Sequence, residues 1–311
     1  GIQIAKNIAA FTNVPLGDGP GLVPIFDGRL PDGSRVNGTI PPVTPDGPTL
    51  TIRKFREDPL TMIDLVKFGT VNSRLAAMMW VWIEGLDSRP ANFVIAGGTG
   101  SGKTTTLNCH GMFIPWGRRL LTVEDTAELQ VYHDHWLRME TRRQRPDGTA
   151  EVDMNDCLQS SLRMRPDRII VGEVRGPEAA TLLTAMNTGH DGSFGSLHAN
   201  TAQETVTRMI NPPMNVPPIM LSGLDLIIIQ ARLHVNGKTA RKITEVAEIA
   251  GMEGDKPRLN IIWKYNAATD QIEETGIPSK LREIICAAAG VSPDVFERHV
   301  SQRQKIRDEL A

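Results

Sequence analysis

Gly97-Gly98-Thr99-Gly100-Ser101-Gly102-Lys103-Thr104-Thr105 is the stretch that decides the fold, and it directly follows the apolar run Phe93-Val94-Ile95-Ala96. It satisfies the pattern Gly-x4-Gly-Lys-Ser/Thr, in which a strand feeds a glycine-rich turn and a helix follows. Successive backbone N–H groups in such a turn point into one concavity, and the helix N-terminus adds positive potential. The stretch therefore predicts a loop that binds the phosphates of a nucleoside triphosphate.

Residue type within this loop indicates which contacts to expect. The Lys103 ammonium would reach the β- and γ-phosphates, and the Thr104 hydroxyl would ligate Mg²⁺. The expected cofactors are therefore a nucleoside triphosphate and Mg²⁺. The nucleotide-binding residues expected from the loop are Gly98, Thr99, Gly100, Ser101, Gly102, Lys103, Thr104 and Thr105.

The rest of the chain has the strand and helix pattern that this loop requires. Helical segments alternate with the apolar runs, which are Phe93–Ala96, Leu120–Val123, Ile169–Val171 and Gly195–Leu197. Such alternation predicts an α/β fold with a parallel sheet and helices on both faces. A strand pair is expected at Ile243–Ile249 and Asn260–Tyr265, followed by terminal helices at Ile277–Ala289 and Ser292–Leu310.

Three regions are expected along the 311 residues, because one core seldom accounts for so long a chain. Residues 1–53 carry short alternating strands among many glycines and prolines, which indicates a small domain with a sheet joined by turns. Residues 54–59 are expected to link it to the nucleotide-binding domain, residues 60–311. Since the chain starts with Gly1, we expect the natural protein to continue upstream, so that this first domain is partial.

Composition disfavours several other classes of protein. Hydrophobic residues make up 40% and charged residues 23%, which is ordinary for a globular protein, and the net charge is -2. Because nucleic-acid-binding domains are usually basic, nucleic acid is not expected as the main ligand. The three cysteines are widely spaced, and no zinc site is expected from them. Neither a membrane-spanning run nor a signal peptide is visible, and a reducing cytoplasm fits the cysteine usage.

Acidic side chains follow two of the predicted strands. Glu124, Asp125 and Glu128 come after Leu120–Val123, and Glu173 comes after Ile169–Val171. Since the carboxyl ends of parallel strands lie beside a phosphate loop, these groups are expected near the γ-phosphate. There a carboxylate can hold Mg²⁺ through water, as expected for Glu173, or orient the attacking water.

A histidine and several arginines complete the set of candidates. His198 follows the short strand Gly195–Leu197, where a neutral imidazole could hydrogen-bond a phosphate. Hydrolysis of this kind also needs positive charge on the transferred phosphoryl group, often from an arginine outside the loop. Arg35 and Arg53 of the amino-terminal region are candidates, as are several arginines of the nucleotide domain, and composition does not choose among them.

Four motifs in this order resemble the secretion ATPase superfamily, the motors of type II secretion, type IV pili, archaeal flagella and type IV secretion. Gly97–Thr104 resembles its Walker A motif and Thr122–Leu129 its Asp box. Leu162–Arg175, which contains Glu173, is similar to its Walker B motif, and Thr188–Asn200 to its His box. The stretches Asp32–Asn37, Met186–Gly192 and Gly251–Gly254 look most like the tight-adherence pilus and archaeal type IV filament branch.

The resemblance implies a RecA-like P-loop domain preceded by a small PAS-like α+β domain, and a homo-hexameric ring at the inner face of the cell membrane. It implies that ATP hydrolysis drives filament assembly or secretion through a polytopic membrane platform protein. Lys103 and Thr104 would contact phosphate and Mg²⁺, Glu173 would hold Mg²⁺, Glu128 would activate water and His198 would sense phosphate. Arg35 and Arg53 would reach the nucleotide as the two domains close.

Three alternatives stay open on the sequence alone. Glu124 could replace Glu128 as the base. The same chemistry could serve DNA or protein transfer in a type IV secretion system. A nucleotide-gated ring scaffold with little turnover is a further alternative, although Lys103, Glu128 and Glu173 together favour hydrolysis.

Overall fold

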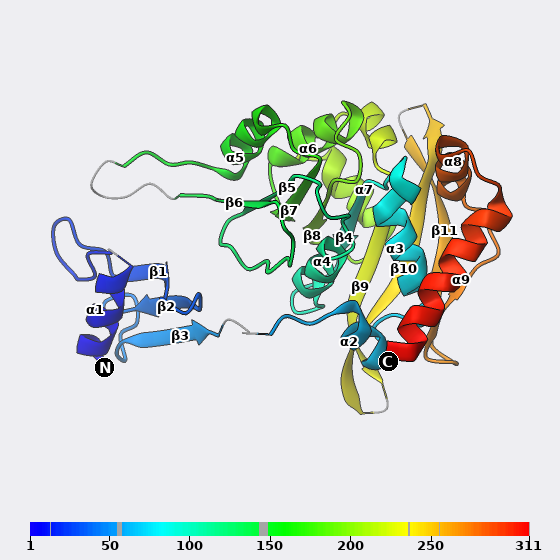
Figure 1. The fold of residues 1–311 in the computed structure, drawn as a ribbon. Coiled ribbons are helices and arrows are strands. Elements are labelled where there is room, and N and C mark those ends of the chain that lie inside the picture. Colours follow the sequence, from blue (N-terminus) through cyan, green and yellow to red (C-terminus); the bar gives the residue numbers. More distant parts are fainter. Residues whose placement is uncertain (13, 55–57, 143–148, 236, 255, 311) are drawn as a thin grey trace. The chain divides into compact units, whose positions relative to one another are not determined.

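The computed structural model describes residues 1–12, 14–54, 58–142, 149–235, 237–254 and 256–310 (Figure 1). Its contacts divide the chain into two compact units, the first made mainly of Gly1–Pro59 and the second of Leu60–Arg142 and Val152–Ala311. Residues 55–57 of the expected linker lie outside the described residues.

The first unit consists of a helix and a small antiparallel sheet. The helix is α1 (Ile2–Phe11), and the strands are β1 (Ile25–Arg29), β2 (Arg35–Thr39) and β3 (Thr49–Arg53). Phe26, Val36 and Ile40 pack with the buried alanines of α1 to form its core. The strands at 35–39 and 49–53 confirm the expected ones, whereas α1 was not foreseen in the sequence.

A nine-stranded sheet forms the centre of the second unit, with the order β12-β11-β10-β9-β4-β8-β7-β5-β6. Its first six strands in the chain are β4 (Phe93–Ala96), β5 (Leu120–Glu124), β6 (Trp136–Glu140), β7 (Arg168–Val174), β8 (Phe194–Leu197) and β9 (Leu226–Val235), and their neighbouring pairs are parallel. The last three are β10 (Lys238–Glu253), β11 (Lys256–Asn266) and β12 (Gln271–Glu274), paired antiparallel.

Helices cover both faces of this sheet, as predicted (Figure 1). The core on one face includes residues of α2 (Met62–Lys67), α3 (Ser73–Glu84), α4 (Lys103–Gly111), α8 (Lys280–Ala289) and α9 (Pro293–Leu310). The core on the other face includes residues of α5 (Met154–Ser161), α6 (Glu178–Asn187) and α7 (Ala202–Ile210). Each face therefore has its own apolar core, which fixes the sheet between two helical layers.

The carboxyl-terminal region confirms one expectation and corrects another. The expected strand pair is present as β10 and β11, which pair antiparallel and extend the nucleotide-binding sheet through β9. Helix α8 begins at Lys280 rather than Ile277. Ser279 caps it by accepting a hydrogen bond from the Arg282 backbone, and Pro278 disfavours helical backbone at Ile277.

Candidate functional site

The glycine-rich loop leaves β4 at Ala96 and enters α4 at Lys103. Gly100 and Gly102 have φ values of 73° and 97°, which favour residues without a Cβ. A Cβ at Gly97 would lie only 2.1 Å from the Gln230 carbonyl oxygen of the neighbouring strand β9. The glycines therefore let the loop turn sharply while its backbone approaches β9.

The Lys103 side chain forms hydrogen bonds with the backbone of its own loop. Its Nζ donates to the carbonyl oxygens of Gly97 at 2.8 Å and Gly98 at 3.2 Å, and the residue is 8% exposed. Burial lowers the pKa of this ammonium, and the nearby Glu173 carboxylate partly offsets the shift. The phosphate oxygens of a nucleotide could replace these carbonyl oxygens. Because they are negatively charged, their hydrogen bonds to the Lys103 ammonium would be stronger.

The chemistry of the loop fits a Mg²⁺-nucleotide. The Ser101 hydroxyl is buried and has no hydrogen-bond partner among the residues that the structure describes, so the loop holds an unsatisfied polar group. Thr104 and Thr105 are half-buried on the first turn of α4. Within the same residues no cluster of three or more acidic, histidine or cysteine side chains could hold a metal by itself. A Mg²⁺ ion here would therefore depend on Thr104, phosphate oxygens and water.

Glu173 and His198 meet beside this loop. Glu173 lies near the end of β7, His198 follows β8, and β8 pairs with both β7 and β4. The His198 Nε2 atom lies 2.6 Å from the Glu173 Oε1 atom. Burial and the positive charge of Lys103 lower the pKa of His198, against the opposing effect of Glu173. The imidazole is therefore neutral at neutral pH.

Arg175 links these residues to the loop after β5. It forms an ion pair with Glu173, and its Nη1 atom lies 3.4 Å from the Asp125 Oδ2 atom. A chain of polar contacts therefore runs from Asp125 through Arg175 and Glu173 to His198. It joins the carboxyl ends of three strands around the phosphate loop.

Glu124 and Glu128 occupy different environments. Glu124 is 3% exposed, and its Oε1 atom accepts the backbone N–H groups of Glu128 at 2.9 Å and Leu129 at 3.0 Å. Burial raises the pKa of Glu124 to about 7, in spite of these two bonds. Glu128 is half-buried. Glu124 therefore holds the segment that carries Glu128, a relationship that the spacing of the two acids did not reveal.

Arg35 and Arg53 belong to the first unit, where they are cross-strand partners on β2 and β3. Arg29 of β1 is the partner of Arg35 on the other side. The three arginines therefore occupy paired positions across one small sheet. The remaining predicted residues all belong to the second unit.

The antiparallel strands bring further residues to the phosphate loop that the sequence did not single out. The Nε atom of Arg241 on β10 donates to the Gly100 carbonyl oxygen at 3.0 Å. Arg232 is its cross-strand partner on β9. Gln230 is buried with its Oε1 atom unpartnered among the described residues, and its Nε2 atom lies 3.0 Å from where a Gly102 Cβ would be. No local motif marks these residues, because only strand pairing brings them to the loop.

The chain belongs to the Type II/IV secretion system protein family, which matches residues 21–275. An uncharacterized protein of Methanocaldococcus jannaschii is 31% identical, with 98% of this chain and 66% of the relative covered. A probable conjugal transfer protein TrbB of Sinorhizobium fredii is 35% identical, with 81% of this chain and 73% of the relative covered. The chain thus spans just under two thirds of the first relative, and it spans 55% of a second one from M. jannaschii.

Solved structures agree on the fold. The pilus retraction motor PilT, determined with bound ADP, has a TM-score of 0.51 at 22% identity, and the match covers 90% of this chain and 69% of that one. The second unit is a RecA-like α/β domain, and a small α+β domain precedes it. Among the described residues, no helix has both the length and the apolar character needed to cross a membrane.

Proposed function

We propose that this chain hydrolyses ATP as one subunit of a ring-shaped motor. The observation that carries the proposal is the proximity of Lys103, Glu173 and His198. Lys103 begins α4 after the loop from β4, Glu173 lies near the end of β7 and His198 follows β8, and β8 lies between β4 and β7 in the sheet. A phosphate-binding lysine and a carboxylate placed to hold Mg²⁺ are groups that phosphoryl transfer uses close together. A neutral imidazole beside them can hydrogen-bond a phosphate. Membership of a secretion ATPase family supports the same activity.

In this mechanism the loop backbone and Lys103 bind the phosphates. Thr104 and Glu173 would hold Mg²⁺, Glu173 through water. Bound Mg²⁺ would offset charge on the phosphate oxygens. Glu128 orients the attacking water, because its segment is held by Glu124 and its side chain is the more exposed of the two. His198, already in contact with Glu173, senses the γ-phosphate.

The proposed motor is a homo-hexamer in which Arg35 and Arg53 reach the nucleotide when the two domains close. Residues 1–53 form the mobile amino-terminal domain, 54–59 the linker and 60–311 the ATPase domain. The ring acts at the inner face of the cell membrane on a polytopic platform protein, and it assembles a type IV filament or drives a related secretion step. This assignment rests on family membership and on the motifs that resemble the filament branch.

Conjugal transfer is the second candidate function. Relatives named as conjugal transfer proteins TrbB are 35% and 37% identical to this chain. A type IV secretion motor would use the same residues and differ only in its partners. Dependence of the activity on a secretion-system partner rather than a pilus platform would decide between these functions.

The test is Mg²⁺-dependent ATP hydrolysis measured against protein concentration for the parent, Glu173→Gln and Arg35→Ala. We expect activity per subunit to rise with assembly, and each variant to lose roughly 10²- to 10³-fold. Glu283→Gln and Arg298→Ala, which change exposed residues on α8 and α9, are matched controls and should keep the parent rate.

Two outcomes separate the hypotheses. Tight ATP binding without turnover above that of Glu173→Gln, at any concentration, would favour the nucleotide-gated scaffold. Turnover that is independent of concentration and of Arg35 would contradict a ring whose arginines complete the site.

A further inference from the structure

Strand β7 departs from regular pairing at the acid that is proposed to hold Mg²⁺. Its register with β8 shifts between Val171 and Val174. Within this shift two residues of β7, Gly172 and Glu173, lie opposite a single residue of β8, Ser196. Two residues opposite one form a β-bulge, a feature that is frequent beside active sites and changes the direction of a side chain. The bulge therefore falls at the carboxylate on which the proposed mechanism depends.

This bulge decides on which side of the sheet Glu173 lies. In a regular strand, residues two apart share a face and residues three apart lie on opposite faces. Val171 and Val174 are three residues apart, yet both are buried in the same apolar core. In a regular strand Glu173 would share the face of Val171 and point into that core, where an unpaired carboxylate is costly. The extra residue lets Glu173 contact His198 instead.

One hydrogen bond holds the bulge from the side of β8. The Ser196 hydroxyl donates to the Gly172 carbonyl oxygen at 2.6 Å, and Ser196 is 1% exposed. A bulge interrupts the regular backbone ladder, so the polar backbone groups beside it need other partners. Ser196 supplies such a partner for the residue directly before Glu173.

A second side chain holds the backbone on the other side of Glu173. Glu178, the first residue of α6, is 5% exposed. Its Oε1 atom accepts the backbone N–H groups of Arg175 at 2.6 Å and Gly176 at 2.8 Å. Hydrogen bonds from N–H groups to a carboxylate are stronger than those between neutral groups. The turn that follows β7 is therefore fixed by a buried side chain of the next helix.

We propose that Ser196 and Glu178 are positioning residues that keep Glu173 in the geometry needed for hydrolysis. They act on the backbone before and after Glu173, and neither has to touch the nucleotide. The proposal rests on the function proposed above for Glu173 and adds the two side chains on which that function depends. Removal of side chains that orient a metal-holding group commonly lowers activity roughly 10- to 100-fold.

The experiment measures steady-state ATP hydrolysis by the whole chain for Ser196→Ala, Glu178→Ala and Glu178→Gln. We expect each alanine variant to lower kcat roughly 10- to 100-fold and to leave the KM for ATP unchanged, because the phosphate loop is intact. Glu178→Gln keeps an oxygen that can accept the two backbone N–H groups, so it should restore most of the lost rate. A kcat that neither alanine variant lowers would overturn the proposal.

Combination with Glu173→Gln separates positioning from a general loss of stability. If Ser196 and Glu178 act through Glu173, their alanine substitutions should slow the Glu173→Gln variant by less than about twofold, because residues that act as a unit are not additive. The same fold-loss in the parent and in Glu173→Gln would contradict the proposed role.

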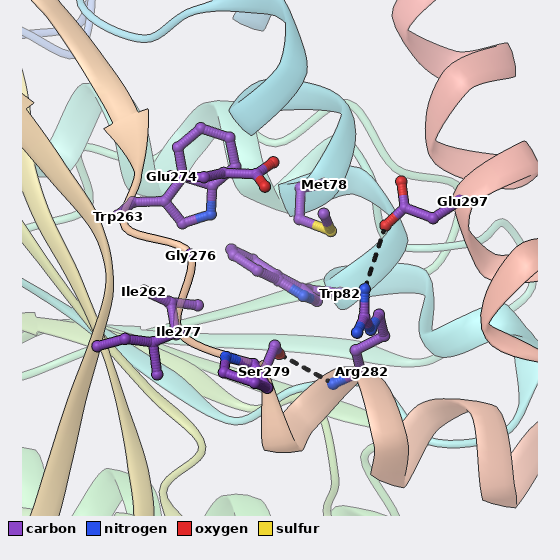
Figure 2. A pocket seen from close by; sticks show the side chains of 11 residues that line it. Met78, Trp82, Ile262, Trp263, Glu274, Gly276, Ile277, Ser279, Arg282 and Glu297 are labelled. Carbon is purple, nitrogen blue, oxygen red and sulfur yellow. Dashed lines mark hydrogen bonds and ion pairs between the residues drawn. The ribbon is translucent and has the colours of Figure 1, made fainter.

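Ser279→Ala and Glu297→Ala are the matched controls, since they remove hydrogen bonds of a serine and a glutamate elsewhere in the second unit. Ser279 accepts the Arg282 backbone N–H, and Glu297 pairs with the Arg282 side chain (Figure 2). Both residues line a cavity between α3, β11, β12, α8 and α9, which none of the candidate nucleotide-binding residues borders. Both controls should therefore keep the parent kcat.

Crystal structures of the parent, Ser196→Ala and Glu178→Ala test the geometry without hydrolysis. We expect the variants to lose the contact between Glu173 and His198, whose atoms lie 2.6 Å apart in the parent. A bulge and a contact that are unchanged in both variants would overturn the proposal. If the parent shows no Mg²⁺-dependent turnover, the proposed function fails, whereas these structures still decide whether the two side chains hold Glu173.

Discussion

At the scale of single residues, burial decides which acid near the phosphate loop can be charged. Glu124 is enclosed by β5 and β7, and a Cβ at Gly172 would lie 2.9 Å from its Cγ. Its second carboxylate oxygen, Oε2, has no partner among the described residues. A carboxyl group so enclosed keeps its proton to higher pH, so it is better suited to hold the backbone than to activate water.

This environment predicts a pH effect on stability. The pKa of Glu124 rises from 4.5 to about 7 on folding, mainly through burial, so between these values the folded state binds more protons. The contribution of Glu124 to stability is therefore fully present below pH 4.5 and is lost as the pH rises through about 7. The Glu124→Gln variant cannot titrate at this position. We therefore expect the free energy of unfolding of the parent, measured relative to that of the variant, to fall by about 2 kcal/mol between pH 5 and 8.

Urea unfolding followed by tryptophan fluorescence measures this difference, because all five tryptophans lie in the second unit. The exposed Glu283→Gln serves as the control and should show no such change. A parent-to-variant difference that is constant across this pH range would mean that Glu124 is not held neutral by burial.

At the scale of elements, the antiparallel extension of the sheet supports the phosphate loop. The β9–β10 pairing sets Arg232 opposite Arg241, and Arg241 bonds the Gly100 carbonyl. The strands β9 and β10, which are distant from the loop in the sequence, thereby hold one side of it, and Lys103 bonds it from the inside. The loop conformation is thus a property of two elements, not of the motif alone.

Arg241→Ala should therefore weaken nucleotide binding. Loss of one hydrogen bond to the loop corresponds to about a threefold to tenfold lower affinity, and Arg241→Lys should restore part of it. Titration with a fluorescent ATP analogue measures the effect. Arg258→Ala, an exposed arginine on the next strand β11, should bind like the parent. An equal loss in both alanine variants would indicate a general effect of surface charge instead.

At the scale of the whole molecule, the candidate catalytic and nucleotide-binding residues are divided between two units. The phosphate loop, the acids and His198 belong to the second, whereas Arg35 and Arg53 belong to the first and are cross-strand partners there. In the proposed motor these arginines act on the same nucleotide only when the domains close. Their effects should then depend on one another.

A double-mutant cycle with Arg35→Ala and Arg53→Ala tests this dependence. Each single variant should lower the hydrolysis rate by roughly 10²- to 10³-fold, and the double variant should be little slower than either, because residues that act as a unit are not additive. Steady-state rates at saturating ATP measure the cycle, with Arg298→Ala as the control. Fully multiplicative losses would show that the two arginines act independently.

Much of the fold could be predicted because its signals are local. Apolar runs marked β4, β5, β7 and β8, and the helices between them followed from periodicity. Helix α1 and strand β6 were missed, since β6 is only partly buried and lacks a continuous apolar run. Strands β10 and β11 were recognised, but their union with the main sheet was not, because strand pairing between distant segments leaves no local pattern.

By itself the sequence determined the phosphate loop, the order of the acidic and histidine motifs, and hence the family, because each depends on residue types at short fixed spacings. Only the tertiary structure decided that Glu173 contacts His198, that Glu124 is buried beneath the Glu128 segment, and that Arg241 holds the loop. Those relations join residues from separate strands, and their burial, pKa and hydrogen bonding exist only once the sheet has assembled.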